Sequence, residues 1–95
     1  MTLSRKGTRI LTVNDQRYRW TVSATDLPSL RFVVEAAEGA AQRMVVRVGA
    51  VETVSPRMVA TAVEAGLRAG WTPDARGPEL HYRLTRGRLV AHAAA

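Results

Sequence analysis

Residues 55–71, SPRMVATAVEAGLRAGW, decide the fold, because they alone combine a helix start, a helical period and a helix stop. Ser55 is a favourable N-cap, since its hydroxyl can accept a hydrogen bond from a backbone N–H of the first turn, and Pro56 suits the first helical position. Small and apolar residues then recur at spacings of three and four and form one stripe: Val59, Ala62, Val63, Gly66, Leu67 and Gly70. Gly70 is typical of a helix end. The segment therefore predicts an amphipathic helix that covers one face of a sheet.

Two residues near the end of this helix carry expectations of their own. Gly66 costs about 1 kcal/mol of helix propensity relative to alanine, so we expect a close approach there, either to the sheet or to Trp71. Trp71 could anchor a partner, since tryptophan is enriched at binding hot spots. Its place directly after the helix end favours a core position instead.

A β-hairpin is expected at the N-terminal side of the chain. Residues 8–13 alternate in polarity and are followed by Asn14 and Asp15, residue types that tolerate the positive φ angles of a tight turn. Residues 16–22 form the return strand. A two-residue turn gives the register: Leu11 opposite Tyr18, Val13 opposite Gln16, Thr12 opposite Arg17 and Ile10 opposite Arg19.

A second pair of strands is expected before the helix. Residues 23–28 have the composition of a loop, residues 30–36 and 42–48 alternate in polarity, and residues 37–41 contain Gly39 and predict a short hairpin loop. With that loop, the residues on the polar face pair as follows: Glu35 opposite Arg43, Val33 opposite Val45, and Arg31 opposite Arg47.

The chain after the helix completes the predicted fold. Residues 72–78 predict a loop, residues 79–85 predict a fifth strand, and residues 86–90 could continue that strand past Gly87. The order β-β-β-β-α-β predicts an α+β domain, in which an antiparallel sheet of four to five strands carries one helix on one face.

The length of 95 residues and the 46% hydrophobic content predict a single domain. We expect residues 1–7 to form a flexible arm, residues 8–90 the α+β domain, and residues 91–95 a frayed tail. The chain contains no cysteine, which excludes disulfides, thiolate zinc sites and a cysteine nucleophile. No stretch has the apolar length of a signal peptide or a membrane span, so we expect a cytoplasmic protein that does not bind membranes.

The net charge of +6 and the pI near 11.3 favour acidic partners, with nucleic acid as the first candidate. Amino-acid composition offers a second explanation of the positive net charge. All but one of the 14 basic residues are arginine, the exception being Lys6, and alanine and valine are abundant. A GC-rich genome tends to produce this usage without selection for binding, and both explanations stay open.

The expected sheet has one apolar and one basic face. The period of two places Tyr18, Trp20 and Phe32 on the face that the helix covers. The opposite face carries the candidate partner-binding residues, which Arg83 could extend: Arg17, Arg19, Arg31, Arg43 and Arg47. Like charges directly opposite each other destabilise a sheet, so Arg31 and Arg47 are easier to explain if an acidic partner lies between them. Alternatively, long arginine stems lie over Val33 and Val45 while their charged heads stay in water.

An acidic protein partner suits this basic face better than nucleic acid. The face has no aromatic residue, whereas proteins that bind single strands use aromatic platforms for base stacking. Duplex binding through arginine–phosphate contacts is the alternative. An edge strand left open could also pair with a second copy to form a dimer.

Enzyme chemistry is not expected. His81 and His92 are the only histidines, and His92 falls in the expected tail, so neither a two-histidine metal site nor a histidine dyad has two ordered members. Ser55 is explained as an N-cap, and no nucleophile elbow or phosphate-binding glycine loop occurs. We therefore predict a non-enzymatic binding or adaptor module without a metal or cofactor.

Four short motifs follow one another in order along residues 8–84: Tyr18-Arg19-Trp20 after a hairpin turn, Gly39 followed by Gln42-Arg43, Pro56 with Val59, and Gly70-Trp71-Thr72-Pro73. In their order and spacing the sequence resembles a group of short, uncharacterised bacterial proteins of similar length. The resemblance implies a free-standing small bacterial protein. It implies no site residue, cofactor or partner, because no function is known for the group.

Overall fold

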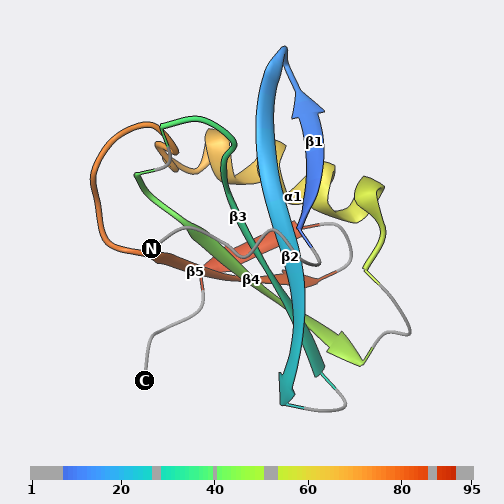
Figure 1. The fold of residues 1–95 in the computed structure, drawn as a ribbon. Helices are drawn as coiled ribbons and strands as arrows, with labels where there is room; N and C mark the ends of the chain where they lie inside the picture. The colour runs from blue at the N-terminus through green and yellow to red at the C-terminus, as the bar shows by residue number, and fades with distance from the viewer. Residues whose placement is uncertain (1–7, 27–28, 40, 51–53, 86–87, 92–95) are drawn as a thin grey trace.

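The computed structural model describes residues 8–26, 29–39, 41–50, 54–85 and 88–91. This part of the chain forms one helix and one six-stranded sheet (Figure 1). The elements in chain order are β1 (Arg9–Val13), β2 (Gln16–Asp26), β3 (Ser29–Ala36), β4 (Met44–Ala50), α1 (Pro56–Arg68), β5 (Leu80–Thr85) and β6 (Arg88–Ala91). The predicted α+β class is confirmed. The expected arm at residues 1–7 lies outside the described residues, and so do residues 92–95 of the expected tail. The prediction that the tail begins at Ala91 is wrong, because Ala91 ends β6 and pairs with Tyr82.

The prediction of a purely antiparallel sheet of four to five strands is wrong. The strands lie in the order β1-β2-β3-β4-β5-β6, and β4 and β5 run parallel while the other pairs are antiparallel. The parallel pair follows from α1, because a helical crossover returns the chain to the starting end of the neighbouring strand. Residues 88–91 do not prolong β5, as expected for residues 86–90, but turn back and pair with it as β6.

The predicted N-terminal hairpin is confirmed residue by residue. All four predicted pairs of β1 and β2 occur, and the turn residues Asn14 and Asp15 have φ angles of 51° and 64°. Strand ends differ from the prediction. β2 continues to Asp26 through the segment expected to be a loop, because its pairing with β3 resumes after a register shift that follows Ser23.

The helix begins and ends as predicted. The Ser55 hydroxyl accepts a hydrogen bond of 3.2 Å from the backbone N–H of Met58, and Gly70 has a φ of 108° just after the C-cap Ala69. Val59, Ala62, Val63 and Gly66 of the predicted stripe are buried, while Leu67 is partly buried and Gly70 is exposed. The buried core comprises Val13, Tyr18, Trp20, Phe32, Val34, Met44, Val46, Val48, Val54, Val59, Ala62, Val63, Trp71 and Leu84. The core therefore lies between α1 and one sheet face.

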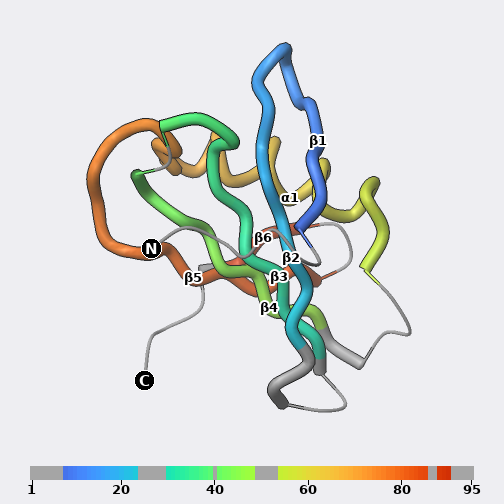
Figure 2. Tube along the Cα trace, viewed as in Figure 1, coloured from blue at the N-terminus to red at the C-terminus, as the bar shows by residue number. Residues whose placement is uncertain are grey.

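The sheet curls around the helix. α1 contacts both β1 and β6, the two outer strands, and β5 runs crosswise to β2 in the tube view (Figure 2). The other face of the sheet points away from α1 and bears the side chains that alternate with the core residues.

A hydrogen-bonded cluster around Gln42, which we call the Gln42 clasp, joins the chain before β4 to the loop that follows α1. The Gln42 side chain accepts from the backbone N–H of Thr72 at 3.0 Å and from the Thr72 hydroxyl at 3.2 Å, and it donates to the carbonyl of Pro78 at 3.0 Å. The Gln42 backbone carbonyl accepts from the Trp71 indole N–H at 3.0 Å. These bonds hold Gln42 and Arg43 out of β4, so this strand starts two residues later than predicted.

The clasp also positions β5. Pro78 is bonded to Gln42, and two residues later the backbone N–H of Leu80 donates to the carbonyl of Arg43 at 3.0 Å. From there the parallel register of β4 and β5 begins with Met44 opposite Leu80. The loop drawn in orange in Figure 1 thus connects the end of α1 to β5, which lies beside β4.

Trp71 belongs to the core, as expected, with 2% of its surface exposed. Its ring centroid lies 5.6 Å from that of Tyr18, so an aromatic pair closes the core at the end of the helix. Burial raises the pKa of the Tyr18 hydroxyl above its ordinary value, and the negative charge of Asp74 adds to the rise. The phenol is therefore kept neutral in this position.

The close approach expected at Gly66 is confirmed. A Cβ atom added there would lie 2.6 Å from the Met44 sulfur and 3.4 Å from Cε3 of Trp71. Met44 is fully buried, and a well-packed core leaves such a side chain little room to move aside.

Replacement of Gly66 by valine should therefore lower the free energy of unfolding by about 2 kcal/mol through overpacking. Urea denaturation measures this loss. Glu64→Val, at an exposed position of the same helix, is the control for β-branching and should change the stability by less than about 1 kcal/mol. A Gly66→Val variant no less stable than Glu64→Val would contradict the close contact with Met44.

Candidate functional site

The candidate site is the sheet face that points away from α1, which we call the open face. On the four inner strands, alternation with the core places these residues on the open face: Arg17, Arg19, Thr21 and Ser23 on β2, Arg31, Val33 and Glu35 on β3, Val45 and Arg47 on β4, and His81 and Arg83 on β5. Arg43 precedes β4 and lies beside this face. All five predicted candidate arginines are thus at or next to the open face.

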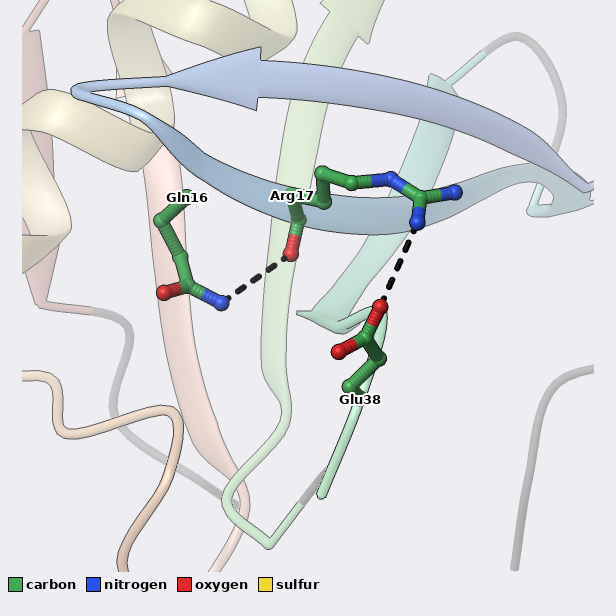
Figure 3. A network of polar contacts seen from close by, with 3 residues as sticks. All are labelled: Gln16, Arg17 and Glu38. Atoms are coloured by element: carbon green, nitrogen blue, oxygen red, sulfur yellow. Dashed lines mark hydrogen bonds and ion pairs between the residues drawn. The ribbon is translucent and has the colours of Figure 1, made fainter.

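Arg17 makes an ion pair at the rim of the open face. Its Nη1 lies 3.2 Å from Oε1 of Glu38, which follows β3 (Figure 3). The backbone supports this approach, because the N–H of Ala37 donates to the carbonyl of Arg17 at 3.0 Å. Both charged side chains are exposed, so the pair adds little stability and leaves Arg17 a rim residue.

Arg19 covers an acidic residue that is buried on the open face. Glu35 is only 1% exposed, and its Oε1 lies 3.7 Å from Nη2 of Arg19. The two residues are direct partners in the register of β2 and β3. The predicted partner of Glu35 was Arg43, but the ladder of β3 and β4 ends at Val34 and Met44. Arg19 is therefore already matched to an acid of its own chain.

Arg43 pairs with an acid that the strand pattern alone does not connect to it. Glu79 lies just before β5, and its carboxylate is 3.4 Å from Nη2 of Arg43 and 3.3 Å from Nε2 of His81. The Gln42 clasp brings these segments together. His81 is a residue of β5 and lies beside Glu79.

Three further arginines, Arg31, Arg47 and Arg83, form a row across β3, β4 and β5. Arg31 on β3 lies opposite Arg47 on β4, as predicted, and Arg47 lies opposite Arg83 on β5. We call these three residues the arginine row. Since neighbouring strands are about 4.8 Å apart, the row places its three backbone positions within about 10 Å. It is the densest basic feature of the open face among the described residues.

Neither end of the arginine row has an acidic partner in the described part of the chain. Arg31 is half-buried, and its Nε is buried without a hydrogen-bond partner among these residues. Arg83 is exposed. A buried donor without an acceptor is costly, and like charges in opposite positions repel. Arg31 and Arg83 at the two ends of the row therefore present positive charge, whereas Arg17, Arg19 and Arg43 are each paired with an acid.

Apolar residues below the arginines explain how the row can form. Val45 is only 3% exposed although it lies on the open face, next to Arg47 along β4. Val33 is half-buried at the neighbouring position on β3. Arginine stems that lie over these valines would cover them and leave the guanidinium groups toward solvent, so stem packing and binding are compatible roles of the same side chains.

The aromatic residues are on the other side, as predicted. Tyr18, Trp20 and Phe32 are buried against the helix, so they cannot stack on a ligand of the open face. No group of three or more histidine, acidic or cysteine side chains suited to a metal occurs among the described residues. In the same part of the chain, no helix is both long and apolar enough to cross a membrane.

Comparison of the chain with protein-family models, curated proteins and solved structures found no match. Function is therefore inferred from the residues of the open face.

Proposed function

We propose that this protein is a non-enzymatic binding module that holds an acidic protein partner against the arginine row. The observation that carries the proposal is the register of Arg31, Arg47 and Arg83 across three strands, with no acidic partner for Arg31 or Arg83 among the described residues. Acidic side chains of a partner would neutralise the repulsion and form charge-assisted hydrogen bonds with the guanidinium groups.

The distribution of acids on the open face supports a protein partner over nucleic acid. Glu35 and Glu79 lie four residues along the chain from Arg31 and Arg83, respectively, and pair with Arg19 and Arg43. A phosphate backbone that tracks across the face would meet the exposed carboxylate of Glu79, whereas a protein surface can place its acids at the row alone. The lack of aromatic residues on the face also removes base stacking as a source of affinity.

A charge-reversal pair tests the proposal. Arg31→Glu combined with Arg83→Glu should lose at least tenfold in affinity for the acidic proteins that the wild type captures from its source cells, because attraction at both ends of the row becomes repulsion. The control is Arg57→Glu with Arg68→Glu, which makes the same change in net charge at exposed positions of α1. Quantitative mass spectrometry of the captured proteins gives the ratio, and urea denaturation verifies that both variants fold. If the row variant and the control variant captured the same proteins in the same amounts, a role for the arginine row in binding would be refuted.

Duplex binding is the second candidate, favoured by the net charge of +6. In a salt titration with duplex DNA, log Kd should then change linearly with log salt. Replacement of Arg31 and Arg83 by glutamine should reduce the slope by about 0.9 for each phosphate that the variant no longer neutralises. Absence of duplex binding at low salt would remove this candidate.

A further inference from the structure

We infer that the partner segment bound by the arginine row is an acidic α-helix whose axis crosses the strands; this inference rests on the proposed function. The direction follows from the register. Arg31, Arg47 and Arg83 lie on β3, β4 and β5, so the line that joins them runs perpendicular to the strands. A partner element that meets both ends of the row, Arg31 and Arg83, must lie along this line.

The spacing of the row distinguishes a helix from an extended strand. Consecutive arginines are separated by the strand spacing of about 4.8 Å, and the two ends of the row by about 10 Å. On a helix, residues i, i+4 and i+7 share one face, with neighbours about 5–6 Å apart and a total rise of about 10 Å. In an extended strand, residues i, i+2 and i+4 share one face at about 6.7 Å each, or about 13 Å in total. From i to i+7 the helix therefore matches the distance between the two ends of the row, Arg31 and Arg83, more closely than the strand does.

The surroundings of the row favour a narrow partner. Glu35 is buried on one side of it under Arg19, and Glu79 lies beside Arg43. A partner with acids spread over a broad surface would bring some of them close to the exposed carboxylate of Glu79. A single helix with its acids in one stripe can contact the row and keep its other faces away from Glu35 and Glu79.

Three peptides of equal length and equal glutamate content test the inference. One is stapled as a helix with glutamates at i, i+4 and i+7, the second is the same stapled helix with glutamates distributed around it, and the third is extended with glutamates at alternate positions. Fluorescence anisotropy at low salt measures their affinity for the wild type, for Arg31→Gln with Arg83→Gln, and for the control Arg57→Gln with Arg68→Gln.

The one-faced helix should bind the wild type about tenfold more tightly than either other peptide, and the row variant should remove this advantage while the control keeps it. Equal affinity of the three peptides, with weaker binding by the row variant, would overturn the helix and leave the proposed function standing. Tighter binding of the extended peptide would also overturn the helix and leave the proposed function standing. If the affinities of all three peptides are the same for the row variant as for the wild type, both the helix and the proposed function are overturned.

Discussion

Truncation of Trp71 to alanine should lower the free energy of unfolding by about 3–5 kcal/mol, which is the largest effect expected of a single substitution in this chain. The side chain is 2% exposed, its ring packs 5.6 Å from that of Tyr18, and its indole N–H donates to the carbonyl of Gln42 at 3.0 Å. The substitution removes the packing and the hydrogen bond together, and it leaves a cavity at the end of the helix. Urea denaturation followed by circular dichroism measures the loss.

A comparison of the two tryptophans separates these contributions. Trp20 is also 2% exposed, but its indole N–H is buried without a hydrogen-bond partner among the described residues. Trp71→Phe and Trp20→Phe remove similar apolar area, so their difference reports the hydrogen bond of Trp71. We expect Trp71→Phe to cost about 1 kcal/mol more than Trp20→Phe. The reverse order would show that the bond to Gln42 does not stabilise the fold.

Replacement of Gln42 by leucine should lower the free energy of unfolding by about 2–3 kcal/mol, because leucine keeps much of the volume but makes none of the side-chain hydrogen bonds. The side chain of Gln42 accepts two of these bonds from Thr72 and donates one to Pro78. Each such bond contributes about 1 kcal/mol net. The midpoint of thermal unfolding should fall by about 10–20 °C for a domain of this size.

Gln16→Leu is the matched control for this substitution. Gln16 is exposed, and its side chain makes one long hydrogen bond of 3.5 Å to the carbonyl of Arg17, shown in Figure 3. Its replacement should change the stability by less than about 0.5 kcal/mol. If Gln42→Leu and Gln16→Leu lowered the free energy of unfolding equally, the side-chain bonds of the Gln42 clasp would not stabilise the fold. In Gln42→Leu we also expect hydrogen exchange of the β5 amides to increase, because the clasp positions that strand.

Local signals predicted the parts of the fold that depend on neighbouring residues. Asn14 and Asp15 allow a two-residue turn, and this turn alone gives the register that places Leu11 opposite Tyr18. Ser55 and Gly70 mark the ends of the helix in the same way. The pairing of Arg31 with Arg47 was also correct, because a short loop joins the two strands.

The errors concern contacts between distant segments. The alternation of β5 shows which residues share a face, but a period of two contains no information about the neighbouring strand or its direction. β6 has only four residues, too few for a clear pattern, and was merged with β5. The acidic partners of Arg19 and Arg43 were also missed, because each lies on a different segment of the chain. Glu35 is on the neighbouring strand β3, and Glu79 is brought to Arg43 by the Gln42 clasp. Arg83, expected only as an extension of the basic face, completes the arginine row.

The parallel pairing of β4 and β5 has a consequence for the order of folding. β1 to β4 are connected in sequence and pair antiparallel, so they can form early at a small entropic cost of loop closure. Met44 meets Leu80 only after the helix and its following loop have been placed. Until then β4 is an unpaired edge rich in valine, which is the kind of segment that associates with other chains. Nascent chains that lack β5 would therefore expose β4 as a valine-rich edge, and β4 becomes an inner strand only when the last strands have paired.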